Sequence, residues 1–316
     1  MSGMSGKGGV RGRRGASGKD GVSGKRGTRP GEKKIRAAAL GIAATVLVVA
    51  GVIAALRLAG VSGQPPVKGS LEDYSWDQVK AISLLVREAE SDEAALAIAQ
   101  RYHLCAEDGS IDASQTKAVT LTTGESFDVR LIGLRDDTME GGGTLGLTFC
   151  FAEPVTVQSM SSEKTNFGGW EYSYVRSYLS QSLLGLLPSE LKDNITPAKK
   201  RTNNVGMSES PDAVSETADS LWLLSLAEVY GASGGETAPE GYLPDVGDLE
   251  GEQYELFSQQ GANWEQGAGV MAGQGVLWLR SPSCTTNAGF ALVGSDGMAA
   301  YGTPLESHGI VPAFCI

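Results

Sequence analysis

Twenty uncharged, mostly apolar residues run from Ala37 to Leu56 and constrain the chain more than any other feature. At about 1.5 Å per residue, a helix of this length reaches roughly 30 Å, the thickness of a bilayer's hydrocarbon core. The run therefore predicts one transmembrane helix over residues 37–56. A cleaved signal peptide is the alternative, but its apolar region usually spans about 7–15 residues and ends at a small-residue cleavage site. Here the run is longer, and Arg57 follows it directly.

Lysine and arginine are concentrated before this run. Residues 1–36 contain eleven Lys or Arg and two acids, a net charge of +9, whereas the whole chain carries −11, so residues 37–316 carry −20. Basic residues next to a span remain on the cytoplasmic side of the membrane. The pattern predicts a single-pass protein of the cell membrane with its N-terminus in the cytoplasm and its larger part outside. We expect no nucleic-acid partner.

Glycine occupies every third position from Gly3 to Gly27, which is the period of a collagen triple helix. Collagen also needs abundant proline, and the first proline here is Pro30. We therefore predict a disordered basic tail over residues 1–36, attracted to anionic lipid of the inner leaflet.

The remainder divides into a stalk, a helical pair and one domain. Pro65 and Pro66 indicate a stalk over residues 57–70. Ser75 and Gln78 match a helix-capping box, and Ser91 can cap a second helix, which predicts a helical pair within residues 71–116. From Lys117 the apolar period changes from that of a helix to that of a strand, so a domain over residues 117–316 begins there.

The predicted fold class of this domain is α+β, with small antiparallel sheets and short helices. Alternating apolar residues predict a hairpin over 119–131, strands at 145–151, 221–224, 290–293 and 311–316, and helices near 175–179, 188–195, 225–230 and 253–259. Residues 198–218 have the composition of an exposed polar excursion. The final strand predicts that the C-terminus is paired inside a sheet.

Five strings occur in this domain in one order: Gly-Gly-Trp-Glu-Tyr-Ser (168–173), Val-Arg-Ser-Tyr-Leu (175–179), Leu-Trp-Leu-Leu-Ser-Leu-Ala-Glu-Val-Tyr-Gly (221–231), Trp-Leu-Arg-Ser-Pro (278–282) and Gly-Ile-Val-Pro-Ala-Phe-Cys-Ile (309–316). On these strings, residues 117–316 resemble a bacterial family, the domain of unknown function 6273, found on secreted and surface proteins of Gram-positive bacteria. The resemblance implies a family without implying a function.

The order of elements is also similar to the C-type-lectin-like fold and its formylglycine-generating branch. That similarity implies a mixed lectin-like domain, but it does not carry an activity. The formylglycine-generating enzymes use closely spaced cysteines near the C-terminus, whereas Cys284 and Cys315 lie 31 positions apart. The Glu-Pro-Asn, Gln-Pro-Asp and Trp-Asn-Asp motifs of calcium lectins do not occur.

No motif in the sequence establishes catalysis. Residues 231–235 match Gly-x-Ser-x-Gly, but the nucleophile turn of hydrolases joins a strand to a following helix, and here the motif follows a helix. The two histidines, His103 and His308, lack the ligand spacing of a zinc site and are expected to be structural. We therefore predict that the protein is not an enzyme and needs no cofactor.

Calcium is the one metal that the acidic residues leave open. Carboxylate oxygens bind calcium, and two acidic groups are candidates: Asp136, Asp137 and Glu140, and Asp245, Asp248, Glu250 and Glu252. Neither group has EF-hand spacing, and solvated acidic loops are the simpler interpretation.

The four cysteines permit three disulfide pairings. We favour Cys105–Cys150 and Cys284–Cys315, with buried free thiols as the alternative. The absence of Cys-x-x-Cys argues against redox catalysis.

Three residues are candidates for ligand contact. Trp264 and Tyr301 lie in predicted loops, where exposed aromatic rings stack on sugars or anchor partners, although packing is the simpler role. Arg280 follows a buried tryptophan and is expected to pair with a carboxylate inside the domain or to reach an anionic ligand.

The sequence thus predicts a membrane-anchored external domain that binds a glycan or a protein at the cell envelope. A structural protein that only displays or spaces something is the alternative, and an enzyme on a lectin-like scaffold is the third possibility. Two titratable groups within hydrogen-bond reach in a pocket would favour the enzyme.

Overall fold

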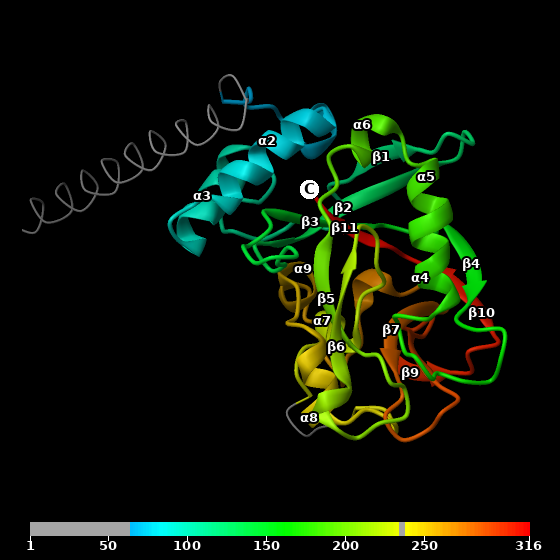
Figure 1. Ribbon diagram of the computed structural model, residues 1–316. Helices are drawn as coiled ribbons and strands as arrows, with labels where there is room; N and C mark the ends of the chain where they lie inside the picture. Colours follow the sequence, from blue (N-terminus) through cyan, green and yellow to red (C-terminus); the bar gives the residue numbers. More distant parts are fainter. Residues whose placement is uncertain (1–63, 234–237) are drawn as a thin grey trace, which may run out of the picture. The chain divides into compact units, whose positions relative to one another are not determined.

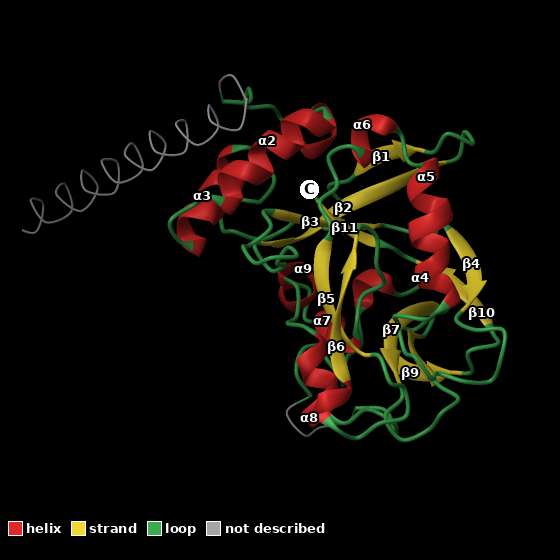
Figure 2. Ribbon diagram, viewed as in Figure 1, coloured by secondary structure: helices red, strands yellow, loops and turns green. Residues whose placement is uncertain are grey.

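A computed structural model describes residues 64–233 and 238–316 (Figure 1). These residues form short helices and strands joined by many loops, as the colouring by secondary structure shows (Figure 2). The described part is α+β, as the sequence predicts, with small antiparallel and mixed sheets.

The helical pair consists of α2 (Trp76–Arg87) and α3 (Asp92–Arg101), which lie side by side in Figure 1. The predicted capping box is present, because Ser75 Oγ accepts from the Gln78 amide at 3.3 Å and the Ser75 amide donates to Gln78 Oε1 at 3.0 Å. Ser91 caps α3 by accepting from the Ala94 amide. The indole of Trp76 packs edge-on against Phe149 and Phe314, so the pair shares the core of the domain.

The first sheet has the order β1 (Lys117–Thr120), β2 (Ser126–Leu134), β3 (Leu147–Phe151) and β11 (Ala313–Cys315). The predicted hairpin corresponds to the antiparallel pair β1–β2. The C-terminal strand β11 is paired with β3 in register Phe314 to Phe149, which confirms the prediction for the end of the chain.

The second sheet has the order β4 (Thr156–Ser159), β10 (Ser307–Ile310), β7 (Leu277–Pro282), β8 (Phe290–Val293) and β9 (Ala299–Gly302). Its strands are antiparallel except β10 and β7, which are parallel. All six residues of β7 are buried, so this strand lies in the core.

A third sheet is the hairpin β5 (Ala198–Asn203) and β6 (Val214–Asp219), where the sequence predicted a polar excursion. Alternate residues of β5 are buried, but one of them is Lys200. The alternation of buried and exposed residues was not recognised in the sequence, because a lysine is normally a surface residue and Lys200 is on the buried face. The predicted strand at 221–224 is a buried extended segment with a single bridge from Trp222 to Ala313.

Short helices and helical turns connect these sheets: η1 (Leu71–Asp73), α4 (Tyr174–Tyr178), η2 (Leu179–Leu183), α5 (Leu184–Leu186), α6 (Ser189–Lys192), η3 (Pro211–Ala213), α7 (Leu226–Tyr230), α8 (Pro244–Gly247), η4 (Asp248–Glu250), α9 (Glu255–Gln259) and η5 (Gly269–Met271). The second predicted capping box is present at α7, where Ser225 and Glu228 cap each other's backbone.

Within residues 64–233 and 238–316, no helix combines the length and the apolar character needed to cross a membrane. The helix α2 has 12 residues, so it reaches about 18 Å against a hydrocarbon core of about 30 Å. This corrects the sequence-based fold class, which included a transmembrane helix, and with it the prediction of a single-pass protein of the cell membrane. The predicted tail, span and first part of the stalk, residues 1–63, lie outside the described residues.

Candidate functional site

A groove of about 440 Å³ lies between α3, the end of β2 and α9. Its floor includes the apolar residues Leu96, Ile111 and Leu134. Carboxylates dominate the polar lining, which consists of Asp92, Glu93, Asp136, Glu252, Glu255, Arg135 and Gln259. Arg135 binds Asp92, with 3.3 Å from Nε to Oδ1. The other four carboxyl groups of the lining therefore have no unpaired arginine or lysine of the lining beside them.

The end of β2 is bent to form this groove. The register between β2 and β3 shifts between Leu131 and Gly133, and Arg135 has a positive φ of 66°. A Cβ at Gly133 would lie 1.8 Å from Asp136 Oδ2 and 2.9 Å from Glu255 Oε2. Only glycine therefore leaves room for both carboxyl groups. Backbone strain of this kind concentrates at functional sites.

Asp136 and Glu255 form a carboxyl pair in the groove. Their side chains are in hydrogen-bond contact, and Glu255 Oε2 also accepts from the Leu134 amide at 3.1 Å. Loss of solvent around its carboxyl raises the pKa of Asp136 above its ordinary value, and the hydrogen bond and charge of Glu255 raise it further. The nearby charges Asp137 and Lys200 act in opposite directions on this pKa. The pKa of Asp136 therefore lies above that of an ordinary aspartate.

A buried charge network lies next to the pair. The Lys200 ammonium binds Asp137 Oδ1 at 2.6 Å and Glu228 Oε1 at 2.5 Å. Tyr254 donates to Asp137 Oδ2 at 2.9 Å, and Thr148 donates to the same oxygen at 2.7 Å. Although burial alone raises the pKa of Asp137, the Lys200 charge outweighs it and leaves this pKa below its ordinary value. Asp137 is thus a fully compensated carboxylate.

The network continues through Arg280, whose guanidinium forms a two-point ion pair with Glu228. Arg280 also donates to the Glu250 carbonyl at 2.6 Å. The Glu250 carboxylate accepts from the Asn203 amide at 2.9 Å and from the Ser281 hydroxyl. Burial raises the pKa of Glu250 to about 7, against the opposing charge of Arg280. The charges of Asp137, Lys200, Glu228 and Arg280, from four separate segments, balance one another inside the core.

A second hollow of about 180 Å³ borders this network and shares Asp136 and Glu252 with the groove. We call the groove and this hollow together the cleft. Lys199, Lys200 and Arg201 of β5 also line the second hollow. The cleft therefore has an acidic part beside α3 and a part with mixed charge beside β5.

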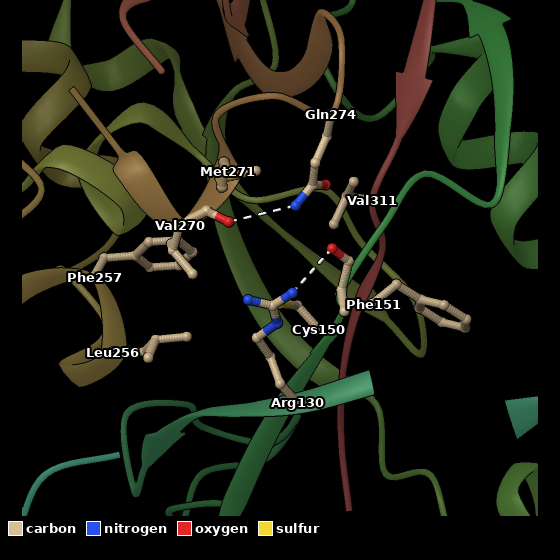
Figure 3. Close-up of a pocket in the computed structure, with 10 residues that line it drawn as sticks. Arg130, Cys150, Phe151, Leu256, Phe257, Val270, Met271, Gln274 and Val311 are labelled. Carbon is tan, nitrogen blue, oxygen red and sulfur yellow. Dashed lines mark hydrogen bonds between the residues drawn. The ribbon is translucent and has the colours of Figure 1, made fainter. Parts of the chain in front are cut away.

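A further hollow lies between β2, β3 and the loop around η5 (Figure 3). Figure 3 shows Arg130 and Gln274 pointing into it from opposite sides, with Phe257, Val270 and Val311 around them. Arg130 donates to the Ala152 carbonyl at 3.0 Å. Its volume of about 10 Å³ is that of one water-sized sphere, so it holds no larger ligand.

The model of one protein family, described as Domain of unknown function (DUF6273), matches residues 145–316. This match covers more than half of the chain. The chain belongs to the DUF6273 family. No curated protein and no solved structure matches it, so neither comparison supports the similarity to the C-type-lectin-like fold.

The cleft lies where the DUF6273 region meets the preceding part of the chain. The DUF6273 region supplies β5, α7 and α9, with Lys200, Glu228 and Glu255. Asp92 and Asp136 come from the segment before it. The carboxyl pair is thus completed by residues on both sides of the family boundary.

The structure does not bring the three predicted contact residues into one site. Trp264 is 6% exposed, packs between the tilted rings of Tyr230 and Tyr242 with ring centroids at 5.3 and 4.7 Å, and donates to the Gly231 carbonyl. Arg280 is fully buried and pairs with Glu228. Both side chains therefore have partners inside the domain, which agrees with the packing role predicted for Trp264 and the internal pairing predicted for Arg280. Tyr301, in β9, is half-buried.

The predicted disulfides are also corrected, because all four cysteines are buried free thiols. Each has a separate environment. Cys150 lines the small hollow, Cys284 lies 3.9 Å from Asn203 Nδ2, and Cys315 lies 3.4 Å from Asp137 Oδ2. Burial raises the pKa of Cys105 and of Cys150 to about 12, so these thiols are poor nucleophiles at neutral pH.

The remaining candidates have local roles. His103 Nδ1 contacts the Lys68 carbonyl at 2.5 Å, and His308 packs on Trp278 with ring centroids at 4.6 Å. Ser233 is buried just after α7, and the residues that follow it lie outside the described ranges. Among the described residues, no group of three or more His, Cys, Asp or Glu side chains is arranged to hold a metal ion.

Sequence reasoning missed the pairing of Asp136 with Glu255 and the burial of Lys200. Asp136 and Asp137 were considered together as a calcium candidate, whereas the structure gives them different partners. One signal was present in the sequence: Glu228 caps α7 and Arg280 follows a buried tryptophan, so both were expected to be tied inside the domain.

Proposed function

We propose that this protein is a binding module whose cleft takes up a peptide carrying a basic side chain. The observation that carries the proposal is the Asp136–Glu255 pair, which faces a groove of about 440 Å³. Among the described residues, neither carboxyl group forms an ion pair within 4 Å. An ammonium or guanidinium group from a ligand would supply the missing positive charge.

The lining of the groove favours a peptide over a sugar. Sugar sites commonly use exposed aromatic rings for stacking, and no aromatic residue lines the groove. The groove instead combines carboxylates with an apolar floor of Leu96, Ile111 and Leu134. Its volume lies in the range of about 300–1,000 Å³ that is typical of small-ligand pockets. The alternative of a purely structural protein predicts a surface without a groove at this position.

Calorimetric titration of the full chain with N-acetyl-Lys-Ala-Ala amide tests the proposal. We expect binding that is lost when norleucine replaces the lysine, because norleucine keeps the length and removes the charge. Asp136→Asn and Glu255→Gln should each weaken binding about tenfold, which is about 1.4 kcal/mol. Glu153→Gln is the matched control, since Glu153 is exposed and lies outside the cleft lining. Equal binding of the lysine and norleucine peptides would sink the proposal.

An enzyme is the second candidate, because two titratable groups lie within hydrogen-bond reach in a hollow. A protonated Asp136 can donate a proton while Glu255 accepts one, which is the arrangement used in general acid–base catalysis. Mass spectrometry of the peptide after prolonged incubation separates the two functions. A product that disappears with Asp136→Asn would favour the enzyme, and an unchanged peptide would favour binding alone.

A further inference from the structure

The two walls of the groove differ in how they are held. On one side, Glu255 of α9 accepts from the Leu134 amide at 3.1 Å, which ties α9 to the end of β2. The other wall is α3, and the buried residues of this helix are Ala95 and Ala99. Two alanines bury little apolar surface, although such burial supplies most of the stability of a helix in a protein. The position of α3 therefore depends on further contacts.

Arg135 makes two of these contacts. Its Nη1 donates to the Ala89 carbonyl in the turn between α2 and α3 at 2.6 Å, and its Nε lies 3.3 Å from Oδ1 of Asp92, the first residue of α3. The backbone of Arg135 is itself fixed, because its amide donates to the Gly146 carbonyl at 3.0 Å. Its φ of 66° is uncommon for a residue other than glycine. Arg135 therefore ties the helical pair to the end of β2.

Gln259, the last residue of α9, makes a second link. Its Oε1 accepts from the Ile111 amide at 2.8 Å, in the loop that follows α3. This loop packs on α3, since a Cβ at Gly109 would lie 3.0 Å from Leu96 Cδ2. Arg135 and Gln259 both line the groove. The helix is thus linked to each of the two segments that carry the carboxyl pair.

We propose that the docking of α3 is coupled to peptide binding through Arg135 and Gln259, so that the helical pair regulates the groove. This inference rests on the proposed function and adds the regulation of the same site. A segment held by few buried apolar contacts opens more readily than the core. A peptide that contacts both walls binds well only while α3 is docked, and by linkage it stabilises the docked helix in return.

Calorimetric titration of N-acetyl-Lys-Ala-Ala amide into variants of the full chain tests the coupling. Gln259→Leu removes the bond to Ile111 without a change of charge, and we expect it to weaken binding about fivefold. Gln260→Leu is the matched control, because Gln260 is an exposed neighbour that does not line the groove.

Arg135→Gly removes both contacts to the helical pair and keeps a residue suited to a positive φ. We expect it to weaken binding about tenfold. Loss of a cation from an acidic groove would by itself strengthen the binding of a lysine, so a charge effect and a positioning effect have opposite signs. Arg135→Lys should restore part of the affinity, because one ammonium group can replace one of the two contacts. If Arg135→Gly fails to fold, Gln259→Leu decides the question.

Hydrogen–deuterium exchange of the wild-type chain gives a readout that a merely structural role would not move. Saturating peptide should slow the exchange of the amides of Asp92–Arg101 and of Ile111. Exchange that stays unchanged there while the peptide is bound overturns the inference and leaves the proposed function standing. Wild-type affinity in Gln259→Leu also overturns the inference. A peptide that does not bind the wild-type chain overturns both.

Discussion

Asp136 and Asp137 are neighbours in the chain, yet one faces a groove with an excess of carboxyl groups and the other lies in a network of balanced charges. Asp137 is buried against Lys200, Tyr254 and Thr148, and its charge is balanced by the network around it. Asp136 faces the groove beside Glu255, where carboxyl groups outnumber cations. One carboxylate is part of the buried network, and the other faces the groove in which we propose that a ligand binds.

The difference follows from the number of cations within reach. In the core, Lys200 and Arg280 match Asp137 and Glu228, so each of these four buried charges has a partner. Buried charges are tolerated only when they are paired and hydrogen-bonded. At the groove the sole lining arginine, Arg135, is already bound to Asp92. A region that is balanced has no need of a ligand, whereas an unbalanced one gains from binding a cation.

The largest expected effect comes from removing the Lys200 charge from the buried network. Lys200→Met leaves Asp137 and Glu228 buried with less compensation, so we expect a loss of about 3–5 kcal/mol in the free energy of unfolding. Lys199→Met is the control, because Lys199 forms a partly exposed pair with Glu216 and such pairs contribute about 1 kcal/mol or less. Urea denaturation measures both. Similar losses for the two variants would contradict the role given to the network.

A smaller effect is expected at the junction between the two regions. Gly133→Ala would place a methyl group against the carboxyl groups of Asp136 and Glu255, so we expect a loss of about 1–3 kcal/mol in stability and weaker binding of the lysine peptide. Gly185→Ala is the control, because nothing lies within 4 Å of its added methyl group. Alanine there should be neutral or stabilising. Unchanged peptide binding in Gly133→Ala would show that the close approach of the carboxyl groups does not matter.

The smallest expected effect is the pH dependence of peptide binding at the Asp136–Glu255 pair. The pKa of Asp136 is raised because its carboxyl loses part of its solvent and Glu255 is close. A raised carboxyl pKa means that the folded chain holds the proton more tightly than the unfolded chain does. The free energy of unfolding therefore falls as pH rises from the unfolded-state pKa of Asp136 to its folded-state pKa. A bound cation must displace the proton. Peptide affinity should therefore rise with pH, by up to about tenfold per pH unit for one proton released.

Calorimetry in buffers of different ionisation enthalpy measures that proton release directly. Asp136→Asn should abolish it, and Glu153→Gln should leave it unchanged. Affinity that is flat with pH in the wild-type chain would mean that Asp136 is already ionised before the peptide binds.

Local signals in the sequence predicted much of the fold. The capping boxes at Ser75 and Ser225, the hairpin before Leu131 and the paired C-terminal strand depend on neighbours a few residues apart, and each is present. The hairpin β5–β6 was missed because its buried face includes Lys200. Burial of that lysine depends on carboxylates from distant segments, which no local pattern records.

The candidate site was harder to predict for the same reason. Trp264 looked like a loop aromatic available to a ligand, but Tyr230 and Tyr242 enclose it. The four cysteines suggested two disulfides, whereas they lie as free thiols in separate environments. In each case the residue type indicated a possible role, but residues distant in the sequence determine the environment of the side chain.

The sequence by itself determined the family, the helix caps, the alternation of most strands and the pairing of Arg280 inside the domain. Only the tertiary structure decided which carboxylates are compensated. Coulomb energy depends on the distance between charges and on the solvent around them, and folding sets both by bringing β5, α7 and α9 against the end of β2. Asp136 and Asp137 are alike in sequence and differ because a lysine reaches one of them and a second carboxyl group meets the other.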